Sequence, residues 1–294
     1  MKVLNFGSLN LDYTYRVSHI VREGETISSK DVEMHLGGKG FNQSVALARA
    51  GVPVYHAGLV GEEGLDFYDT CQECGIKTDY IKTVTGRCGH TIIQVDEEGQ
   101  NSIVLFGGAN QKNSKDYVDE VLKNFDTGDI ILLQNEINEL PYIIDQAFAK
   151  GMTIVLNPSP MDERIEECDL GKVSIFVLNE NEGQQLTGMT TPTTIVSALD
   201  ASFANAKIVL TLGKGGSIYH HGDEEYYQAA FDVDTVDTTG AGDTFTGYFI
   251  AGILKKIPMR EVLINASKAA ALAVQKEGAS RSIPFMSEVE LFDM

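Results

Sequence analysis

The ten residues VDTTGAGDTF, numbered 236–245, combine a two-glycine turn, a carboxylate and the start of a helix. Apolar residues four apart, Phe245 and Phe249, predict a helix that begins at about Gly240. Glycine lets successive backbone amides converge, and a helix N-terminus carries roughly half a positive charge, so the turn predicts an anion site. Asp243 would repel an anion, and its presence is explained better by a base that deprotonates a hydroxyl during phosphoryl transfer.

The composition narrows the class of protein. With 294 residues, of which 43% are hydrophobic, the chain is long enough for one substantial core. No run approaches the roughly 20 apolar residues of a membrane helix, and residues 1–7 predict a buried strand rather than a signal peptide, so we expect a cytoplasmic protein. The formal charge of -19 would repel nucleic acid and anionic membranes, which leaves small molecules as the expected ligands.

Short apolar runs alternate with helical patterns along most of the chain. This alternation predicts an α/β fold with a mostly parallel central sheet flanked by helices. The expected strands lie near 2–7, 54–60, 129–134, 152–156, 174–178 and 206–212, and the expected helices near 41–50, 64–74, 114–123, 138–150, 192–204, 241–255 and 259–276.

Two segments, near 13–35 and 88–107, interrupt the alternation and predict additional antiparallel strands. We expect them to form a small lid sheet above the carboxyl ends of the parallel strands, where ligands of open α/β sheets bind. The chain is therefore predicted to be a single domain, residues 1–294, with a lid. Hydrophobic lid residues would be poorly covered in a monomer, which predicts a homodimer through the lid; these residues are Ile92, Val95, Val104 and Phe106.

Polar residues at the expected strand ends suggest two sugar-side clusters. Asn10 and Asp12 would share one face of an extended strand and could hold two hydroxyls, although a simple turn accounts for them equally well. Residues 36–42, LGGKGFN, bring three glycines around one lysine but are not a P-loop, because Gly40 replaces the Ser or Thr that would hold magnesium. Glu136 could accept two hydroxyls of a diol, but its position alone favours solvent exposure.

Two further clusters could bind a metal ion or a nucleotide. Asn179 and Glu182 could hold the hydration shell of Mg²⁺, and a helix N-terminal cap accounts for the same residues almost as well. Residues 211–216, TLGKGG, end a strand with small residues and a cation, which suits nucleotide phosphates or a ribose.

The segments GGKGFN (37–42) and DTTGAGDTF (237–245) resemble the two signature motifs of the ribokinase-like, or PfkB-type, carbohydrate kinases, and the likeness runs from Gly7 to about Pro284. The resemblance implies a ribokinase-like three-layer fold and transfer of the γ-phosphoryl group of ATP to a hydroxymethyl group of a sugar or nucleoside, with Mg²⁺ and K⁺ as cofactors. It also implies a lid that closes over the substrate and often contributes to a dimer.

The resemblance assigns expected roles to individual residues. Asp243 would be the catalytic base, and the amides of Gly240, Ala241 and Gly242 would form the anion hole. The sugar positions would be Asn10, Asp12, Gly38, Lys39, Asn42, Glu136 and Asp243. The nucleotide positions would be Asn179, Thr211, Gly213, Lys214, Gly215, Gly216 and Gly242. Asn179 and Glu182 would act on Mg²⁺ through water, and a monovalent-cation loop would include Asp237, Thr239, Ala273, Lys276, Gly278 and Ser282.

The acceptor is expected to be uncharged, because the sugar positions are mostly Asn, Asp and Glu rather than Arg or Lys. D-ribose, a pentose, phosphorylated at O5 is the first expectation, and a hexose or keto-sugar is an alternative. A nucleoside remains a second alternative, because Phe41, Tyr13 or Phe106 could offer a platform for its base. A non-catalytic sugar-binding regulatory protein is the alternative from a different class, but it would have no reason to keep Asp243 in an anion site.

Overall fold

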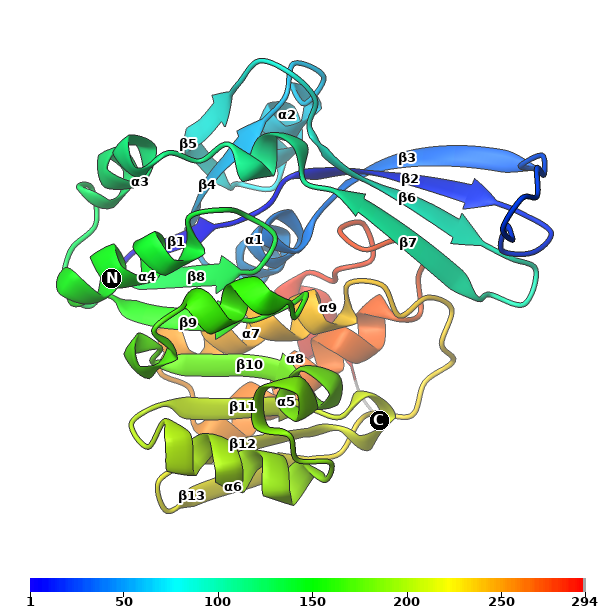
Figure 1. Ribbon diagram of the computed structural model, residues 1–294. Coiled ribbons are helices and arrows are strands. Elements are labelled where there is room, and N and C mark those ends of the chain that lie inside the picture. Colours follow the sequence, from blue (N-terminus) through cyan, green and yellow to red (C-terminus); the bar gives the residue numbers. More distant parts are fainter. Residues whose placement is uncertain (293–294) are drawn as a thin grey trace.

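The computed structural model describes residues 1–292, so the last two residues of the expected domain lie outside the described part (Figure 1). Nine strands form a large sheet in the order β13-β12-β11-β10-β9-β8-β1-β4-β5. Their bounds are β1 Val3–Phe6, β4 Val54–Val60, β5 Lys77–Thr83, β8 Ile130–Gln134, β9 Thr153–Asn157, β10 Ile175–Asn179, β11 Lys207–Thr211, β12 Ser217–His221 and β13 Glu224–Gln228. All neighbours from β5 to β11 pair in parallel, and β12 and β13 add an antiparallel edge.

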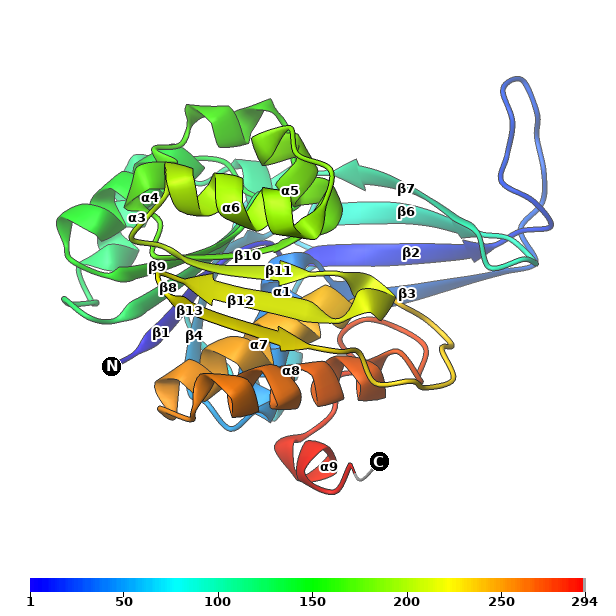
Figure 2. The same ribbon diagram turned by 90° about the horizontal axis from the view of Figure 1, so that it is seen from below.

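Helices cover both faces of the large sheet, which confirms the predicted α/β class (Figure 2). One face carries α1 (Lys39–Arg49), α2 (Asp66–Glu73), α7 (Ala241–Leu254) and α8 (Met259–Ala273), with α9 (Met286–Glu290) outside α8. The other face carries α3 (Lys115–Leu122), α4 (Leu140–Ala149), α5 (Glu180–Thr187) and α6 (Pro192–Ser202). The 3₁₀ helices are η1 (Gly108–Gln111), η2 (Glu163–Glu167), η3 (Leu170–Lys172) and η4 (Gly213–Gly215).

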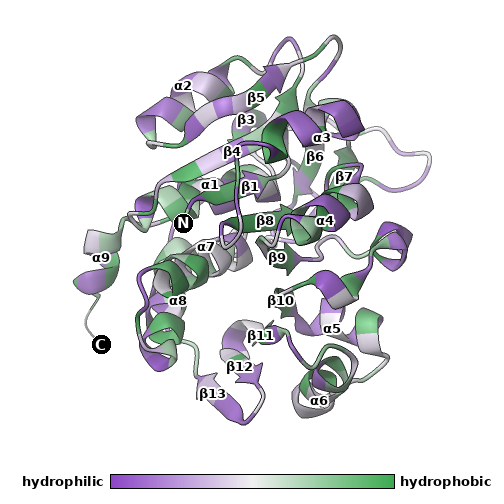
Figure 3. Ribbon diagram, turned by 90° about the vertical axis from the view of Figure 1, so that its left-hand side faces the viewer, coloured by the Kyte–Doolittle hydropathy of each residue, from purple (hydrophilic) through white to green (hydrophobic). Residues whose placement is uncertain are grey.

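The sheet is buried on both faces because its central strands are mostly apolar, with single buried amides at Asn5 and Gln134. Residues 130–134 of β8 are all buried, and so are residues 3–6 of β1. Figure 3 shows these hydrophobic strands at the centre, with more hydrophilic stretches on α2, α3 and β13. Within residues 1–292, no helix has both the length and the hydrophobicity needed to cross a membrane.

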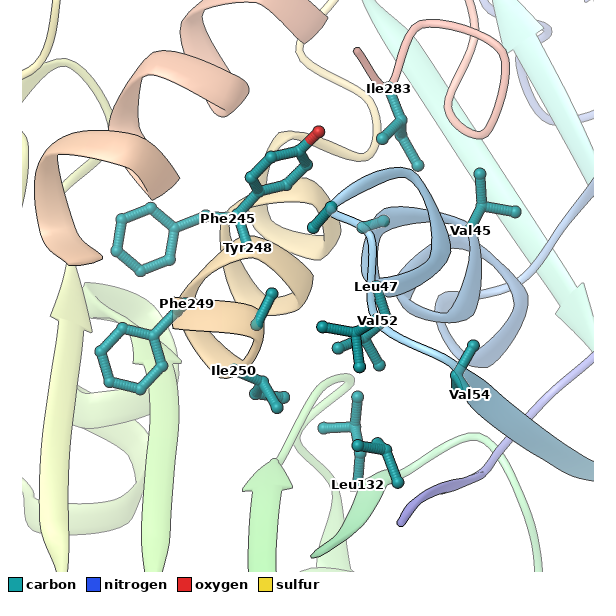
Figure 4. Close-up of a cluster of buried hydrophobic side chains, with 14 of the residues drawn as sticks. Val45, Leu47, Val52, Val54, Leu132, Phe245, Tyr248, Phe249, Ile250 and Ile283 are labelled. Carbon is teal, nitrogen blue, oxygen red and sulfur yellow. The ribbon is translucent and has the colours of Figure 1, made fainter. Parts of the chain in front are cut away.

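Helices α1 and α7 pack closely and bring the two sequence motifs together. Leu47 of α1 and Phe249 of α7 belong to one buried cluster (Figure 4). A Cβ added to Gly247 of α7 would lie 2.4 Å from Cβ of Ala46, so only glycine permits this separation of the helices. The N-terminal ends of both helices therefore lie at the same edge of the sheet.

A second sheet of four strands projects from the carboxyl-terminal edge of the large sheet, as predicted for the lid (Figure 1). Its order is β3-β2-β6-β7, with bounds β2 Asn10–Arg16, β3 Asp31–Gly37, β6 Gly89–Val95 and β7 Asn101–Phe106. The prediction of antiparallel strands is wrong for one pair, because β2 and β6 run parallel. Both strands leave the large sheet at the same edge, β2 after β1 and β6 after β5, so they run outward in the same direction.

Four other details of the structure differ from the expectations. The first lid segment begins at Asn10 rather than near residue 13, and Val95 shares the face of Arg16, not that of Ile92. The edge strands β5 and β13, and β12 next to β13, were not predicted, because their sequences mix charged and polar residues with few apolar ones. Phe41 cannot serve as a platform for a base, because it is fully buried and contacts Phe67 edge-on with ring centroids 5.1 Å apart.

Candidate active site

The carboxylate of Asp243 lies in the first turn of α7 and is almost completely buried. Its Oδ2 accepts a hydrogen bond from Asn42 Nδ2 at 3.0 Å, and its Oδ1 accepts one from Gln43 Nε2 at 2.9 Å. Each oxygen keeps a further lone pair for another donor. The carboxylate can therefore still accept a hydrogen bond or a proton from a hydroxyl placed next to it.

The turn before α7 has the left-handed geometry that its glycine predicts. Gly240 has φ 76°, and a Cβ there would lie 3.0 Å from Ala279. The amide of Ala241 donates to Thr238 O at 3.2 Å, whereas the next amides belong to the first turn, where helices have no internal acceptor. The amide of Gly242 is thus suited to bind an anion at this helix start.

Glu136 is buried rather than solvent-exposed, so the interpretation favoured by its position alone is wrong. Its Oε2 accepts from Lys39 N at 2.9 Å and also from the hydroxyl of Ser8. The same hydroxyl accepts from Gly40 N at 3.1 Å. These contacts fix the carboxylate at the start of α1.

Asn10 and Asp12 share one face of β2, as their spacing predicts. Asn10 Oδ1 accepts from Asn110 Nδ2 at 2.7 Å, which leaves the amide group of Asn10 as a donor. Asp12 Oδ1 accepts from Thr91 Oγ1 at 2.5 Å. Burial raises the pKa of Asp12 to about 6, and the nearby carboxylates of Glu136 and Asp243 contribute to this rise.

Lys39 completes this group of polar residues. Burial would lower the pKa of its ammonium group, but the carboxylates of Asp243, Glu136 and Glu182 raise the pKa above its ordinary value. The ammonium group therefore stays charged among three acids. We call Asn10, Asp12, Lys39 and Glu136 the polar cluster; it lies beside Asp243.

Asn179 and Glu182 form a capping box at the start of α5. Glu182 N donates to Asn179 Oδ1 at 2.9 Å, and Asn179 N donates to Glu182 Oε2 at 3.0 Å. A helix N-terminal cap was one of the two interpretations of these residues, and the structure contains this cap. Glu182 also lies close enough to Lys39 to influence its charge, so this carboxylate borders the same site.

A pocket of about 610 Å³ lies at the turn before α7, where Thr238, Ala241 and Gly242 line it. It contains five of the residues expected at the nucleotide, namely Thr211, Gly213, Lys214, Gly216 and Gly242, but Asn179 and Gly215 do not line it. Much of its wall is apolar, including Phe231, Phe245 and Val274. The sequence did not identify these apolar residues as part of a pocket, because such residues are typical of a hydrophobic core.

The expected monovalent-cation loop is partly assembled. Asp237 accepts from Thr239 N at 2.9 Å and from Gly278 N at 3.0 Å. Lys276 N donates to Ala273 O at 3.2 Å. The hydroxyl of Ser282 donates to Ala279 O at 3.0 Å, within the same turn as Gly278. The segments 236–239 and 273–282 therefore run side by side.

The sequence matches the pfkB family of carbohydrate kinases over residues 1–286. Among curated proteins it is similar to ribokinase of Staphylococcus aureus (strain COL), with 34% identity over 98% of this chain and 98% of that protein. It is 33% identical to ribokinase of Bacillus subtilis (strain 168), over 97% of this chain and 96% of that protein. The solved structure of Arabidopsis thaliana ribokinase complexed with ribose and ATP superimposes with a TM-score of 0.87 at 32% identity, covering 99% of this chain and 97% of that chain.

Proposed function

Because this chain belongs to the pfkB family of carbohydrate kinases, we propose that it transfers the γ-phosphoryl group of ATP to O5 of D-ribose and releases ribose 5-phosphate. It is accordingly a phosphotransferase with an alcohol acceptor. The end-to-end similarity to ribokinases, and the ribose and ATP bound by the Arabidopsis thaliana relative, support this acceptor and this donor.

The observation that carries the proposal is the position of Asp243, which interacts electrostatically with Asp12 and Lys39 of the polar cluster and directly follows Gly242, a residue that lines the pocket. Asp243 takes the proton from the sugar hydroxyl, and the hydroxyl oxygen attacks the γ-phosphorus in line with the departing ADP oxygen. The amide of Gly242 and the N-terminus of α7 stabilise the negative charge that develops on the phosphoryl oxygens. Asn10, Asp12, Gly38, Lys39, Asn42 and Glu136 are proposed to bind the sugar.

The residues present are compatible with Mg²⁺ and K⁺. The Glu182 carboxylate borders the site and retains lone pairs beyond the capping box, so Asn179 and Glu182 could hold the water shell of Mg²⁺. Bound Mg²⁺ would neutralise phosphate charge. Asp237 and the neighbouring carbonyls of segment 273–282 offer oxygen ligands for K⁺.

Aromatic placement favours a free sugar over a nucleoside. Tyr13 and Phe106 lie on the face of the small sheet opposite to Asp12, because side chains alternate along a strand. Both pack near His90, whose ring centroid is 6.2 Å from that of Tyr13 and 4.9 Å from that of Phe106. With Phe41 in the core, none of the three expected platforms faces the polar cluster.

The same face of the small sheet supports dimerisation. Its exposed apolar residues are Val32, Met34, Ile92, Val104 and Phe106, which the strand registers place together. Val104 is 61% exposed and Val32 51%, which is a large apolar surface for a monomer. We infer a cytoplasmic homodimer that associates through this face, which we call the outer lid face.

An ADP-release screen with ribose, 2-deoxyribose, fructose, adenosine and cytidine tests the function. Ribose should give the highest kcat/KM. A higher kcat/KM for adenosine would show that the acceptor is a nucleoside rather than a free sugar. Asp243→Asn should lower kcat by about 10² to 10⁴ and retain ribose binding. Activity of this variant within threefold of wild type would remove Asp243 from its role, and ribose binding without any phosphorylation would indicate a regulatory protein instead.

A further inference from the structure

Gln43 lies next to Asn42 on α1, is fully buried, and has no part in the steps above. Its Nε2 donates to Asp243 Oδ1 at 2.9 Å and to Asn157 Oδ1 at 3.0 Å. Its Oε1 accepts from Gln134 Nε2 at 2.6 Å. Both amide protons and the carbonyl oxygen of Gln43 are therefore engaged, and one of these contacts is made to the proposed catalytic carboxylate.

The orientation of the Gln43 amide is determined by its neighbours. An ionised carboxylate can only accept hydrogen bonds, so Asp243 requires a donor at this position. Asn157 Nδ2 donates to Val177 O at 2.9 Å, which turns the oxygen of Asn157 toward Gln43. If the Gln43 amide were reversed, its oxygen would face two acceptor oxygens.

A second layer of amides holds Gln43 from behind. Gln134 Nε2 also donates to Asn5 Oδ1 at 3.0 Å, and Asn5 Nδ2 donates to Gly40 O at 2.6 Å and Ser44 Oγ at 2.8 Å. Asn5, Gln134 and Ser44 are fully buried. Buried polar groups that are bonded in this way resist rearrangement, because breaking a contact leaves an unpaired group away from water.

We propose that Gln43 is a positioning residue that fixes the carboxylate plane of Asp243, an inference that rests on the proposed function. The terminal torsion of an Asp side chain has a broad energy minimum, so the carboxylate needs external contacts to hold one orientation. Asn42 holds one oxygen and Gln43 the other. Both are neutral donors from consecutive residues, so they orient the base without adding charge.

Two charged groups from other elements interact electrostatically with Asp243. They are Asp12 of β2 and Lys39 at the start of α1, and Glu136 after β8 lies close to both of them. Asp12 and Glu136 are acids and cannot donate a hydrogen bond to the Asp243 carboxylate when ionised. The side-chain amides of Asn42 and Gln43 are thus the uncharged donors that hold the Asp243 carboxylate in one orientation.

Two variants of nearly the same size as Gln43 test the proposal. Gln43→Met removes both donors, and we expect kcat to fall roughly 10- to 100-fold while KM for ribose stays within about threefold. The acid limb of the kcat profile should move to higher pH, because a lost donor disfavours the charged form of a carboxylate. Gln43→Glu should lose more activity than Gln43→Met above neutral pH, because it places a second carboxylate against Asp243.

Ser44→Ala is the matched control, because the Ser44 hydroxyl belongs to the same buried layer but bonds to Asn5 and His56 rather than to the side chain of Gln43 or Asp243. It should lower the urea midpoint of unfolding without a change in kcat or in the acid limb. If Gln43→Met does not fold, Gln43→Glu and Gln134→Met, which frees the Gln43 carbonyl oxygen, provide the same kinetic comparison.

A folded Gln43→Met enzyme with kcat within about twofold of wild type and an unmoved acid limb would overturn the positioning role. An inactive Asp243→Asn variant beside that result would leave the proposed function intact. An active Asp243→Asn variant would instead remove the proposed function, and the positioning role with it.

Discussion

Lowering the pH should weaken sugar binding through Asp12. The pKa of this carboxyl is raised to about 6, first by burial and then by neighbouring carboxylates. At pH 7.5 about 97% of the group would be ionised, and at pH 5 about 9%. If only the ionised form accepts two sugar hydroxyls, the Kd for ribose rises about tenfold over this range, or roughly 1.4 kcal/mol.

The expected loss of ribose binding at low pH would not result from destabilisation of the fold by Asp12. A carboxyl whose pKa is raised by folding binds its proton more tightly in the native state than in the unfolded state. Between its ordinary value of 3.8 and about 6, lower pH therefore increases its contribution to stability. Lower pH should thus weaken ribose binding without causing local unfolding around Asp12.

Isothermal titration calorimetry with ribose, in the absence of nucleotide, measures the effect without contribution from the catalytic step. Asp12→Asn is the control, because an amide can still accept from Thr91 but does not titrate; its weaker affinity should be the same at both pH values. A wild-type Kd that changes less than twofold, or an equal slope in Asp12→Asn, would refute the assignment to Asp12.

Three further predictions concern the small sheet, the core and the outer lid face. Gly89→Ala would place a Cβ 2.1 Å from Asn110 Nδ2 and 2.3 Å from Asn10 Oδ1, so we expect KM for ribose to rise by about tenfold or more in steady-state assays. Phe41→Ala should lower the free energy of unfolding by about 3 to 5 kcal/mol in urea titrations, because this ring is fully buried; a loss below about 1 kcal/mol would contradict the packing. Val104→Glu should halve the mass measured by light scattering while the melting temperature of the monomer changes little, and an unchanged mass would exclude association through this face.

The central sheet could be predicted because its strands are continuous apolar runs, such as residues 130–133, and short runs of this kind are typical of strands buried on both faces. Asp243 could be predicted because a helix start, glycines and a carboxylate coincide in sequence. The parallel pairing of β2 and β6 could not, because pairing depends on where each strand leaves the large sheet and not on its own residues.

The supporting residues of the site were missed for a similar reason. Gln43, Gln134 and Asn110 are single amides far apart in the sequence, and no spacing rule identifies them. Their role follows from contacts across 91 and 200 residues, as between Gln43 and Gln134 or Gln43 and Asp243. Only the folded chain brings them together.

The junction between β1 and β2 limits how the small sheet can move. Only Gly7, Ser8 and Leu9 separate the two strands, and all three are buried. Gly7 N donates to Ala57 O at 3.0 Å, and Leu9 N donates to Asn110 Oδ1 at 3.0 Å, so the root of β2 is anchored to the body. Any swing of the lid therefore pivots beyond this junction, so the start of β2 stays with the body, and the proposed sugar site would keep one fixed wall whether or not a nucleotide is bound.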